Sequence, residues 1–323
     1  MTRFQLTRKI TIGTRGSQLA LWQTRWVKAE IEKHHRDIEV VIKIISTKGD
    51  RVLDVSLPKL GEQGKGLFTK ELEDAILAGR VDIAVHSLKD LPTELPAGLQ
   101  IGAICEREDP RDALVARAGV NSFQELPQGA VIGTSSLRRQ AQLRAARPDL
   151  ELIAIRGNVD TRLRKLDEGG FDAIVLAAAG LDRLGHADRI TQHLSDELVL
   201  PAVGQGALAI ETRADDAAID EIVRALDHTP TRLACMAERA FLRGLGGGCL
   251  VPIAAHAKIE AGVITLNGLV ASADGSEVMR DRRSGRVEET NLIGEQLAKD
   301  LLARGAGRIL SSIEERVTKF ELP

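Results

Sequence analysis

The chain has 323 residues and a formal net charge of −2, so it has room for two or three domains and no overall positive charge that would attract nucleic acid. Hydrophobic residues make up 43% and charged residues 28%, which is typical of a globular protein. Aromatic residues account for only 2%, and Tyr is absent, which disfavours the stacking surfaces that bind single-stranded nucleic acid.

Cysteine usage and the absence of long apolar runs bear on the compartment. The cysteines at 105, 235 and 249 are odd in number and have no CxxC spacing, which favours a reducing compartment over a disulfide framework. The start, MTRFQLTRKITIG, has no apolar run of signal-peptide length, and no segment approaches the roughly 20 apolar residues of a membrane span. We therefore expect a cytoplasmic protein with no membrane partner.

Short apolar runs alternate with amphipathic stretches through the first two-thirds of the chain. The runs predict buried strands at 9–13, 40–46, 81–86, 130–133, 152–155 and 172–178. The stretches predict helices at 17–34, 69–79, 137–147 and 160–168. This alternation indicates an α/β fold, in which parallel sheets carry helices on both faces. In such sheets, ligands bind beyond the carboxyl ends of the strands.

Two pairs of segments resemble each other. IGTRGSQLALWQ (12–23) resembles IGTSSLRRQAQL (132–143), and GRVDIAV (79–85) resembles GGFDAIV (169–175). The repeat predicts two domains of similar topology, although strand–turn–helix units can also look alike by chance. EREDPRDAL (106–114) and LPAVGQGALAIE (200–211) are candidate hinges. If the second returns to the first sheet, two connections join the domains.

The carboxyl-terminal part follows another pattern. HAKIE, VITLNGLVA and EVMRDR predict three strands, and helices are expected at about 288–303 and 306–318, which together make a smaller α+β domain. Residues 48–67 have no clear period and contain four glycines. A loop of that length is a functional lid or a solvated surface segment. As a lid, it would bring Lys59 and Lys65 to an anionic ligand.

Arginines recur at three predicted strand-to-helix junctions. In GTSSLRRQ (133–140), Ser135 or Ser136 is a good N-cap, which places Arg138 and Arg139 in the first helical turn. Cations there oppose the helix macrodipole by about 0.3–1 kcal/mol each. The other junctions have the same pattern, with Arg15 and the capping Ser17 in GTRGS, and with Arg156 and Arg162 around the capping Asn158 in RGNVDTRLRKL.

A bound anion would offset the unfavourable placement of these arginines. A single arginine of this kind is more commonly a surface residue that covers apolar side chains. Three junctions with the same pattern favour an anion site instead, and guanidinium groups suit planar carboxylates. The sequence therefore predicts a site for several carboxylates or phosphates. It has no Walker loop and no complete GxGxxG after a strand, which disfavours a nucleotide.

VHSLKDLPTELP (85–96) supplies a candidate catalytic carboxylate. Asp90, next to Lys89 in a site rich in guanidinium groups, would stay ionised and could stabilise a developing cation. Its alternative role is to cap the turn before Pro92. His86 is expected to pack at a strand end, and the seven histidines show no metal-ligand spacing, so no metal is expected.

Cys249 lies in GLGGGCLVPI (244–253), directly after three glycines whose backbone can approach another molecule closely. A thiol presented in this way can carry a covalent group. Cys105 and Cys235 are instead expected to pack as small hydrophobic residues.

These segments together resemble the porphobilinogen deaminase family, also called hydroxymethylbilane synthases. The matching segments run in the family's order from about residue 10 to 253: GTRGSQLALWQ, GKGLFTKELE, VDIAVHSLKDLP, ICEREDPRDAL, GTSSLRRQ, RGNVDTRL, DAIVLAAAGLDRLG, LPAVGQGALAIE and GGGCLVPI. The resemblance implies two doubly wound α/β domains similar to periplasmic binding proteins, and a smaller α+β domain. Their expected bounds are 1–105 with 205–224, 110–201, and 228–323, the last carrying Cys249.

The resemblance also implies an activity. It implies a transferase that joins four porphobilinogen molecules head to tail, with loss of ammonia at each step, to give hydroxymethylbilane. The product grows on a dipyrromethane cofactor held by a thioether at Cys249. Asp90 matches the family's catalytic aspartate. The positions that match cofactor contacts are Lys89, Ser136, Arg138, Arg139, Arg156, Arg162 and Arg183, and those that match substrate contacts are Arg15, Ser17 and Phe68.

The sequence allows alternatives for individual residues and for the function. A packed core position is the alternative for Phe68, and the loop LGEQGKGLF is slightly longer than the common bacterial form, so Lys65 has no residue-by-residue match. A non-enzymatic two-lobed protein that binds a small polycarboxylate is the alternative function, but it would need no Cys249. A nucleic-acid-binding module is disfavoured by charge and composition. We expect a monomer, since no apolar interface stripe is evident.

Overall fold

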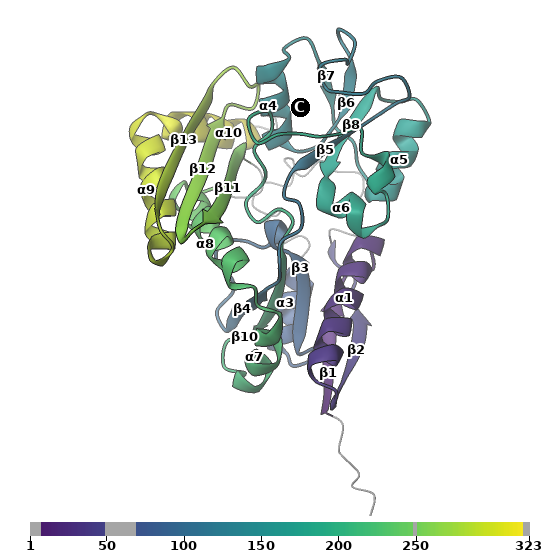
Figure 1. Cartoon of the computed structure of the whole chain (residues 1–323), viewed down its shortest axis with the longest axis vertical. Coiled ribbons are helices and arrows are strands. Elements are labelled where there is room, and N and C mark those ends of the chain that lie inside the picture. The colour runs from purple at the N-terminus through teal and green to yellow at the C-terminus, as the bar shows by residue number, and fades with distance from the viewer. Residues whose placement is uncertain (1–7, 49–68, 248–250, 319–323) are drawn as a thin grey trace, which may run out of the picture. The chain divides into compact units, whose positions relative to one another are not determined.

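The computed structural model describes residues 8–48, 69–247 and 251–318, with side chains described as far as residue 313. The chain divides into two compact units. The first contains residues 8–48, 69–107 and Ala207–Arg232. The second contains Glu108–Gly206 and the described residues from 233 onward. Figure 1 labels the elements of both.

The first unit is built on a mixed five-stranded sheet of order β2-β1-β3-β10-β4. β1 is parallel to β2 and β3, whereas β10 is antiparallel to β3 and β4. The expectation of a wholly parallel sheet is therefore wrong, but the predicted return of the chain to this sheet after residue 200 is confirmed. The strands are Arg8–Thr14 (β1), Ile38–Ile44 (β2), Ile83–Ser87 (β3), Leu99–Ile104 (β4) and Leu208–Arg213 (β10).

Helices cover both faces of this sheet. Ile83 and Val85 of β3 belong to a core shared with α1 (Gln18–His34) and α7 (Ala217–Val223). Ala84 between them belongs to a separate core with α3 (Lys70–Leu77). Successive side chains of a strand point to opposite faces, so this division places α3 on the face opposite to α1 and α7.

The second unit contains a sheet of order β7-β6-β8-β5-β9. β6 is parallel to β7 and β8, while β5 is antiparallel to β8 and β9. α4 (Leu137–Ala146) covers one face, and α5 (Val159–Asp167) and α6 (Ala178–Arg183) cover the other. The strands are Asp112–Ala116 (β5), Val131–Gly133 (β6), Glu151–Ile153 (β7), Ala173–Ala177 (β8) and Gln192–His193 (β9).

The two sheets have the same strand order and the same directions, which confirms the topology predicted from the internal repeat. The shared Asp of GRVDIAV and GGFDAIV has the same contact in both. Asp82 Oδ2 accepts a hydrogen bond from Thr11 N at 2.8 Å, and Asp172 Oδ2 accepts one from Val131 N at 2.8 Å. Each carboxylate therefore ties the start of one strand to its parallel neighbour.

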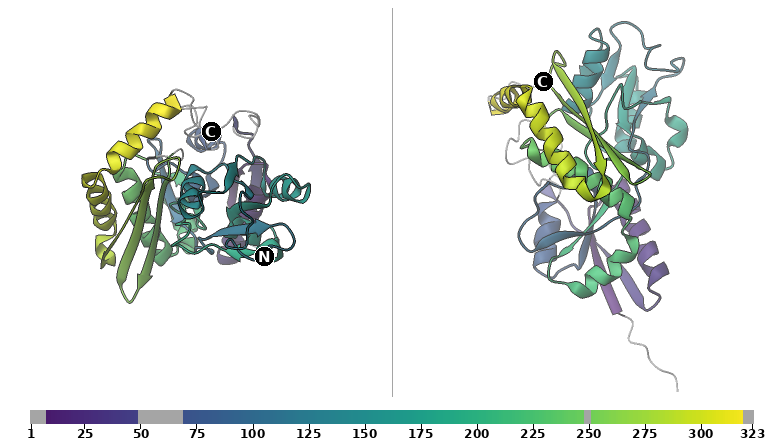
Figure 2. Two further views of the ribbon diagram at one scale, coloured as in Figure 1. Left: turned by 90° about the horizontal axis from the view of Figure 1, so that it is seen from above. Right: turned by 60° about the vertical axis from the view of Figure 1, so that its left-hand side comes forward.

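The rest of the second unit is an α+β layer, as predicted. An antiparallel sheet of order β11-β12-β13 is formed by Ile253–Glu260, Val263–Ala271 and Val278–Arg286. α9 (Thr290–Ala303) lies along one face of this sheet (Figure 2), and α8 (Thr229–Gly244) and α10 (Ala306–Thr318) contribute to the same core. Apolar residues of α4, β11 and β12 share a further cluster with Leu200.

The structure confirms the predicted fold class, with mixed α/β sheets and a smaller α+β domain. The four helices expected in the first two-thirds are observed within two residues of their predicted bounds. β4, β5 and β9 were not expected from the sequence. The segment interpreted as a hinge at 106–114 contains the start of β5 at Asp112, so that interpretation is wrong for its last three residues.

Candidate functional site

In the first unit, the junction between β1 and α1 carries two of the predicted substrate residues. Ser17 is the N-cap of α1, and its Oγ accepts a hydrogen bond from Ala20 N at 3.3 Å, which confirms the predicted cap. Arg15 lies in the loop between β1 and this cap, and its side chain is half-buried. Both residues therefore lie at the carboxyl end of a parallel strand.

Lys89 and Asp90 lie at the end of the neighbouring strand. They occupy the short 3-10 helix Leu88–Asp90, which directly follows β3. Gln23 Nε2 of α1 donates a hydrogen bond to Ser87 Oγ at 2.9 Å, which joins α1 to the end of β3. Because β1 and β3 are parallel, the structure brings Arg15, Ser17, Lys89 and Asp90 to one edge of the sheet, and Asp90 is exposed there.

His86 is packed, as predicted, and takes no part in this edge. It is 6% exposed, and its Nε2 lies 2.9 Å from Glu211 Oε2 on β10. Glu73 of α3 lies near the same pair. Burial raises the pKa of the Glu73 carboxyl group, and the negative charge of Glu211 raises it further. These groups form a buried polar cluster beneath β3.

In the second unit, two predicted caps are confirmed. Ser136 caps α4 and accepts a hydrogen bond from Arg139 N at 3.5 Å, and Asn158 caps α5 and accepts one from Thr161 N at 2.9 Å. The cap of α4 also fixes Arg138 and Arg139 in the first turn, as expected.

Arg138 and Arg139 already face an anion that belongs to the protein. Asp112 is fully buried and accepts from Arg138 Nη1 at 2.6 Å and from Arg139 Nη2 at 2.7 Å. Burial would raise the pKa of Asp112, but the charges and hydrogen bonds of the two arginines lower it well below its usual range. The prediction that these arginines wait for a bound anion is therefore incomplete, because a carboxylate of β5 occupies part of their binding capacity.

Arg162 of α5 is in a different situation. Its Nε donates to Gly157 O at 2.8 Å, and among the described residues its guanidinium group forms no ion pair. Burial lowers the pKa of Arg162 to about 10, and the positive charges of Arg139 and Arg156 add to this effect. The structure thus brings three predicted arginines, from α4, α5 and the loop before α5, within electrostatic reach of one another.

Arg183, the last residue of α6, is buried. Its Nη2 donates to Gly206 O at 2.7 Å, and the same carbonyl accepts from Glu108 N at 3.3 Å. This predicted arginine therefore contacts the segment that leads into β10, and the carbonyl that accepts its hydrogen bond also binds the segment that leads into β5.

This set of side chains fits a ligand that carries several carboxylates. Arg162 has no carboxylate partner among the described residues. Arg138 Nε and Nη2 donate no hydrogen bond to any described residue. Buried guanidinium groups that repel one another are stabilised when an anion binds. A dipyrromethane, with acetate and propionate groups on each ring, would supply such anions, so the residues present fit that cofactor.

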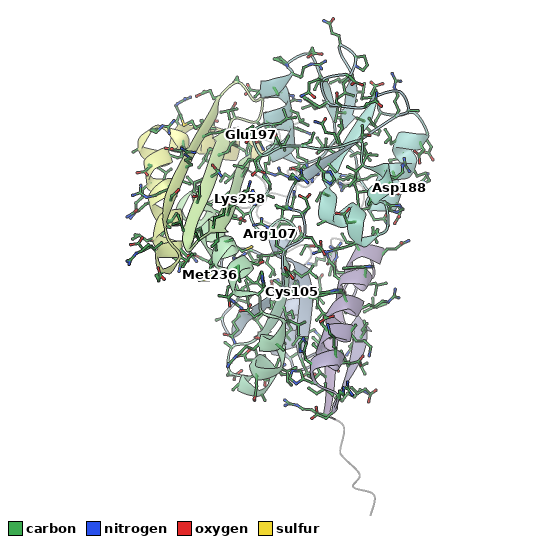
Figure 3. All side chains as sticks on the ribbon, viewed as in Figure 1. Cys105, Arg107, Asp188, Glu197, Met236 and Lys258 are labelled. Carbon is green, nitrogen blue, oxygen red and sulfur yellow. The ribbon has the colours of Figure 1, made fainter. Side chains whose placement is uncertain are left out.

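Four predicted residues, Cys249, Phe68, Lys59 and Lys65, lie outside the described residues. The other two cysteines are 1% and 0% exposed, in agreement with the packing role expected of them, and Figure 3 shows Cys105 at the end of β4. The described part of the chain contains no helix with the length and apolar character needed to cross a membrane. It also contains no group of three or more His, Cys, Asp or Glu side chains that could hold a metal ion.

Two residues of the site, Asp112 and Gln205, were not predicted from the sequence. Gln205 Nε2 donates to Asp112 Oδ1 at 2.9 Å and to Pro110 O at 2.7 Å. A signal for Asp112 did exist, because two adjacent arginines beside a helix cap need a nearby carboxylate if they are to be buried. Nothing in the sequence distinguished Asp112 from the other acids of EREDPRDAL.

Comparisons with known proteins identify the family of the chain. Residues 10–221 match the family model described as porphobilinogen deaminase, dipyromethane cofactor binding domain. Residues 232–303 match the model described as porphobilinogen deaminase, C-terminal domain.

Similar proteins cover almost the full length. The porphobilinogen deaminase of Pelobacter propionicus is 55% identical over 309 residues, covering 96% of this chain and 98% of the relative. That of Geobacter metallireducens is 53% identical over 309 residues, covering 96% of each. A TRAP periplasmic solute binding protein from Desulfovibrio salexigens aligns at 12% identity and a TM-score of 0.42, over 68% of this chain and 72% of the solved one. The assignment rests on the family models and the sequence relatives: the chain belongs to the porphobilinogen deaminase family.

Proposed function

We propose that this chain condenses four porphobilinogen molecules head to tail into hydroxymethylbilane, and that Asp90 is the catalytic carboxylate. This reaction is that of the porphobilinogen deaminase family. Membership of the family disfavours the alternative of a non-enzymatic binding protein. The observation that carries the proposal is the half-buried guanidinium group of Arg162, which lies near Arg139 and Arg156 without an ion pair to any described carboxylate. Such a setting favours a polycarboxylate ligand over a neutral one.

The basic residues of the second unit would bind the cofactor through its carboxylates. When bound, the dipyrromethane supplies the pyrrole end to which the first substrate unit is joined. Arg162 and the remaining N–H groups of Arg138 would hold acetate and propionate groups by charge-assisted hydrogen bonds. The full proposed set is Cys249 as the covalent attachment, with Lys89, Ser136, Arg138, Arg139, Arg156, Arg162 and Arg183 as cofactor contacts.

Asp90 would act on the reacting pyrrole. Loss of ammonia from porphobilinogen leaves a positive charge on the pyrrole, and an ionised carboxylate near the ring N–H stabilises that charge and can guide the proton to the departing amine. The exposed position of Asp90 at the end of β3 leaves its carboxylate accessible to a substrate. Arg15 and Ser17, at the same edge of the sheet, would bind the substrate carboxylates.

Other parts of the proposal concern the whole chain. We infer that Phe68 contacts the substrate and that Lys59 and Lys65 belong to a lid over it. The domains would comprise 1–105 with 205–224, 110–201, and 228–323. The protein would act as a monomer in the cytoplasm, without nucleic acid or membrane partners.

Substitution of Asp90 tests the catalytic assignment. Asp90→Asn keeps the shape and removes the charge, so we expect kcat for porphobilinogen consumption to fall by about 10²–10⁴. The thermal midpoint should stay unchanged, because the Asp90 carboxylate has no hydrogen-bond partner among the described residues. Glu94→Gln, an equal charge change on an exposed neighbour, is the control and should keep full activity. A fully active Asp90→Asn would contradict the assigned role.

A further inference from the structure

The carboxylate of Asp112 has an unusual number of partners. It lies at the first residue of β5 and accepts four hydrogen bonds from the guanidinium groups and Gln205: Arg138 Nη1 at 2.6 Å, Arg139 Nε at 3.0 Å, Arg139 Nη2 at 2.7 Å and Gln205 Nε2 at 2.9 Å. The remaining bonds of the two arginines go to backbone carbonyls. Arg138 Nη1 also donates to Leu200 O at 2.8 Å, and Arg139 Nη1 donates to Val175 O at 2.9 Å.

The antiparallel direction of β5 explains how an acid reaches this position. β6 and β8 are parallel, and α4 with its arginines follows the carboxyl end of β6. β5 runs the opposite way, so its first residue, Asp112, pairs with Ala177, the last residue of β8. A strand that starts where its neighbours end can therefore place a carboxylate at the ligand-binding edge.

The repeated topology of the chain provides an internal control. In the first unit, the residue that pairs with the last residue of β3 is Leu208 of β10, so Leu208 is the counterpart of Asp112. Counted from the two N-caps, the counterparts of Arg138 and Arg139 are Leu19 and Ala20 of α1. The same strand and helix arrangement thus forms without any of the three charges. The topology therefore does not require the charged cluster of Asp112, Arg138 and Arg139, which points to a role in ligand binding.

We propose that Asp112 is a positioning residue, which holds the guanidinium groups of Arg138 and Arg139 in the orientation that binds the cofactor carboxylates. This inference rests on the proposed function. Without Asp112, two adjacent buried cations would repel each other and turn toward different partners. With it, Arg139 is held at all three of its nitrogens, whereas Arg138 keeps Nε and Nη2 without an acceptor among the described residues. Hydrogen-bond donors that are already oriented bind an anion without the free-energy cost of reorienting their side chains.

Gln205, which lies in the segment between β9 and β10, binds the same carboxylate. Its side chain bridges Asp112 Oδ1 and Pro110 O, and it is 0% exposed. Gln205 therefore fixes the position of Asp112 relative to the segment that leads into β5, and the orientation of both arginines depends on that position.

The test compares cofactor loading in two carboxylate-to-amide variants of the same sheet. Full-length apoproteins, made in cells that lack porphobilinogen, are incubated with porphobilinogen and weighed at intervals by mass spectrometry after denaturation. Asp112→Asn should gain the mass of two linked pyrrole units at least tenfold more slowly than the wild type. The matched control is Asp172→Asn, whose carboxylate accepts from Val131 N in the same domain but does not contact Arg138 or Arg139. This control should load at the wild-type rate even if its thermal midpoint falls.

The outcomes separate this inference from the proposed function. If the wild type never gains mass, the proposed function itself is wrong. If the wild type and both variants load at equal rates, Asp112 is not a positioning residue. If Asp112→Asn fails to fold, the triple variant Asp112→Leu, Arg138→Leu, Arg139→Ala, which copies the first unit, decides. A folded triple variant shows that unbalanced arginines caused the failure and supports the inference. A triple variant that also fails to fold shows that the cluster serves the fold, and overturns it.

Discussion

At the scale of single residues, buried positive charge distinguishes this chain from an ordinary α/β protein. Arg138 and Arg139 share one carboxylate, and Arg162 has none among the described residues. The folded state of the apoprotein therefore carries repulsion between positive charges, which a bound polycarboxylate would remove. The sequence allowed these arginines to be predicted as ligand-binding, because they occupy unfavourable positions in first helical turns. It did not allow Asp112 to be predicted, because its role depends on a strand pairing between distant segments.

Arg162→Met should make the apoprotein more stable. The pKa of Arg162 is lowered to about 10 in the folded state, below its value in the unfolded chain, so its charge opposes folding at every pH below about 10. Methionine removes that charge and keeps most of the apolar stem, so the free energy of unfolding at pH 7 should rise by about 1 kcal/mol. Urea unfolding of the two apoproteins measures the difference.

The control for this prediction is Arg164→Met on the same helix. Arg164 is exposed and pairs with Glu168 at 2.6 Å, an i,i+4 pair, so its loss should change stability by less than about 0.5 kcal/mol. After incubation with porphobilinogen, Arg164→Met should load normally and Arg162→Met poorly. An apoprotein that is destabilised by Arg162→Met would show that Arg162 serves the fold rather than a ligand.

At the scale of helices and strands, the sequence predicted the elements that carry a strong local pattern. The helices α1, α4 and α5 begin at capping residues that are recognisable in the sequence, Ser17, Ser136 and Asn158. The antiparallel strands β4, β5 and β9 were missed because their pairing partners are distant in sequence and their flanks are charged or rich in turns. α6 was missed because it follows β8 without a break and continues the same apolar run.

The repeated aspartates provide a prediction at this scale. Asp82→Ala and Asp172→Ala each leave a partly buried backbone N–H without its acceptor, at Thr11 and at Val131. Each substitution should lower the free energy of unfolding by about 1–3 kcal/mol, measured by urea denaturation. The double variant should show the sum within about 0.5 kcal/mol, because the two residues belong to different sheets. Asp182→Ala, at an exposed position, is the control. A loss no greater than that of the control would mean that the repeat is not a shared structural device.

At the scale of the whole molecule, each α/β sheet contains one strand that directly follows a chain connection between the two sheets. β5 follows β4 of the first sheet along the chain, and β10 returns to the first sheet after the second is complete. Strand alternation and the internal repeat were sufficient to predict this arrangement in outline. They could not identify the substrate, because a site for several carboxylates fits many molecules. That choice came from the family resemblance, and the comparisons confirmed the family.

The intact mass of the denatured protein tests the central claim most directly. We predict that the wild type, as purified or after incubation with porphobilinogen, exceeds its sequence mass by two linked pyrrole units. Cys249→Ser, treated in the same way, should show the sequence mass alone. The claim would be contradicted by a wild-type mass that stays unmodified after incubation, or by the same excess on Cys249→Ser.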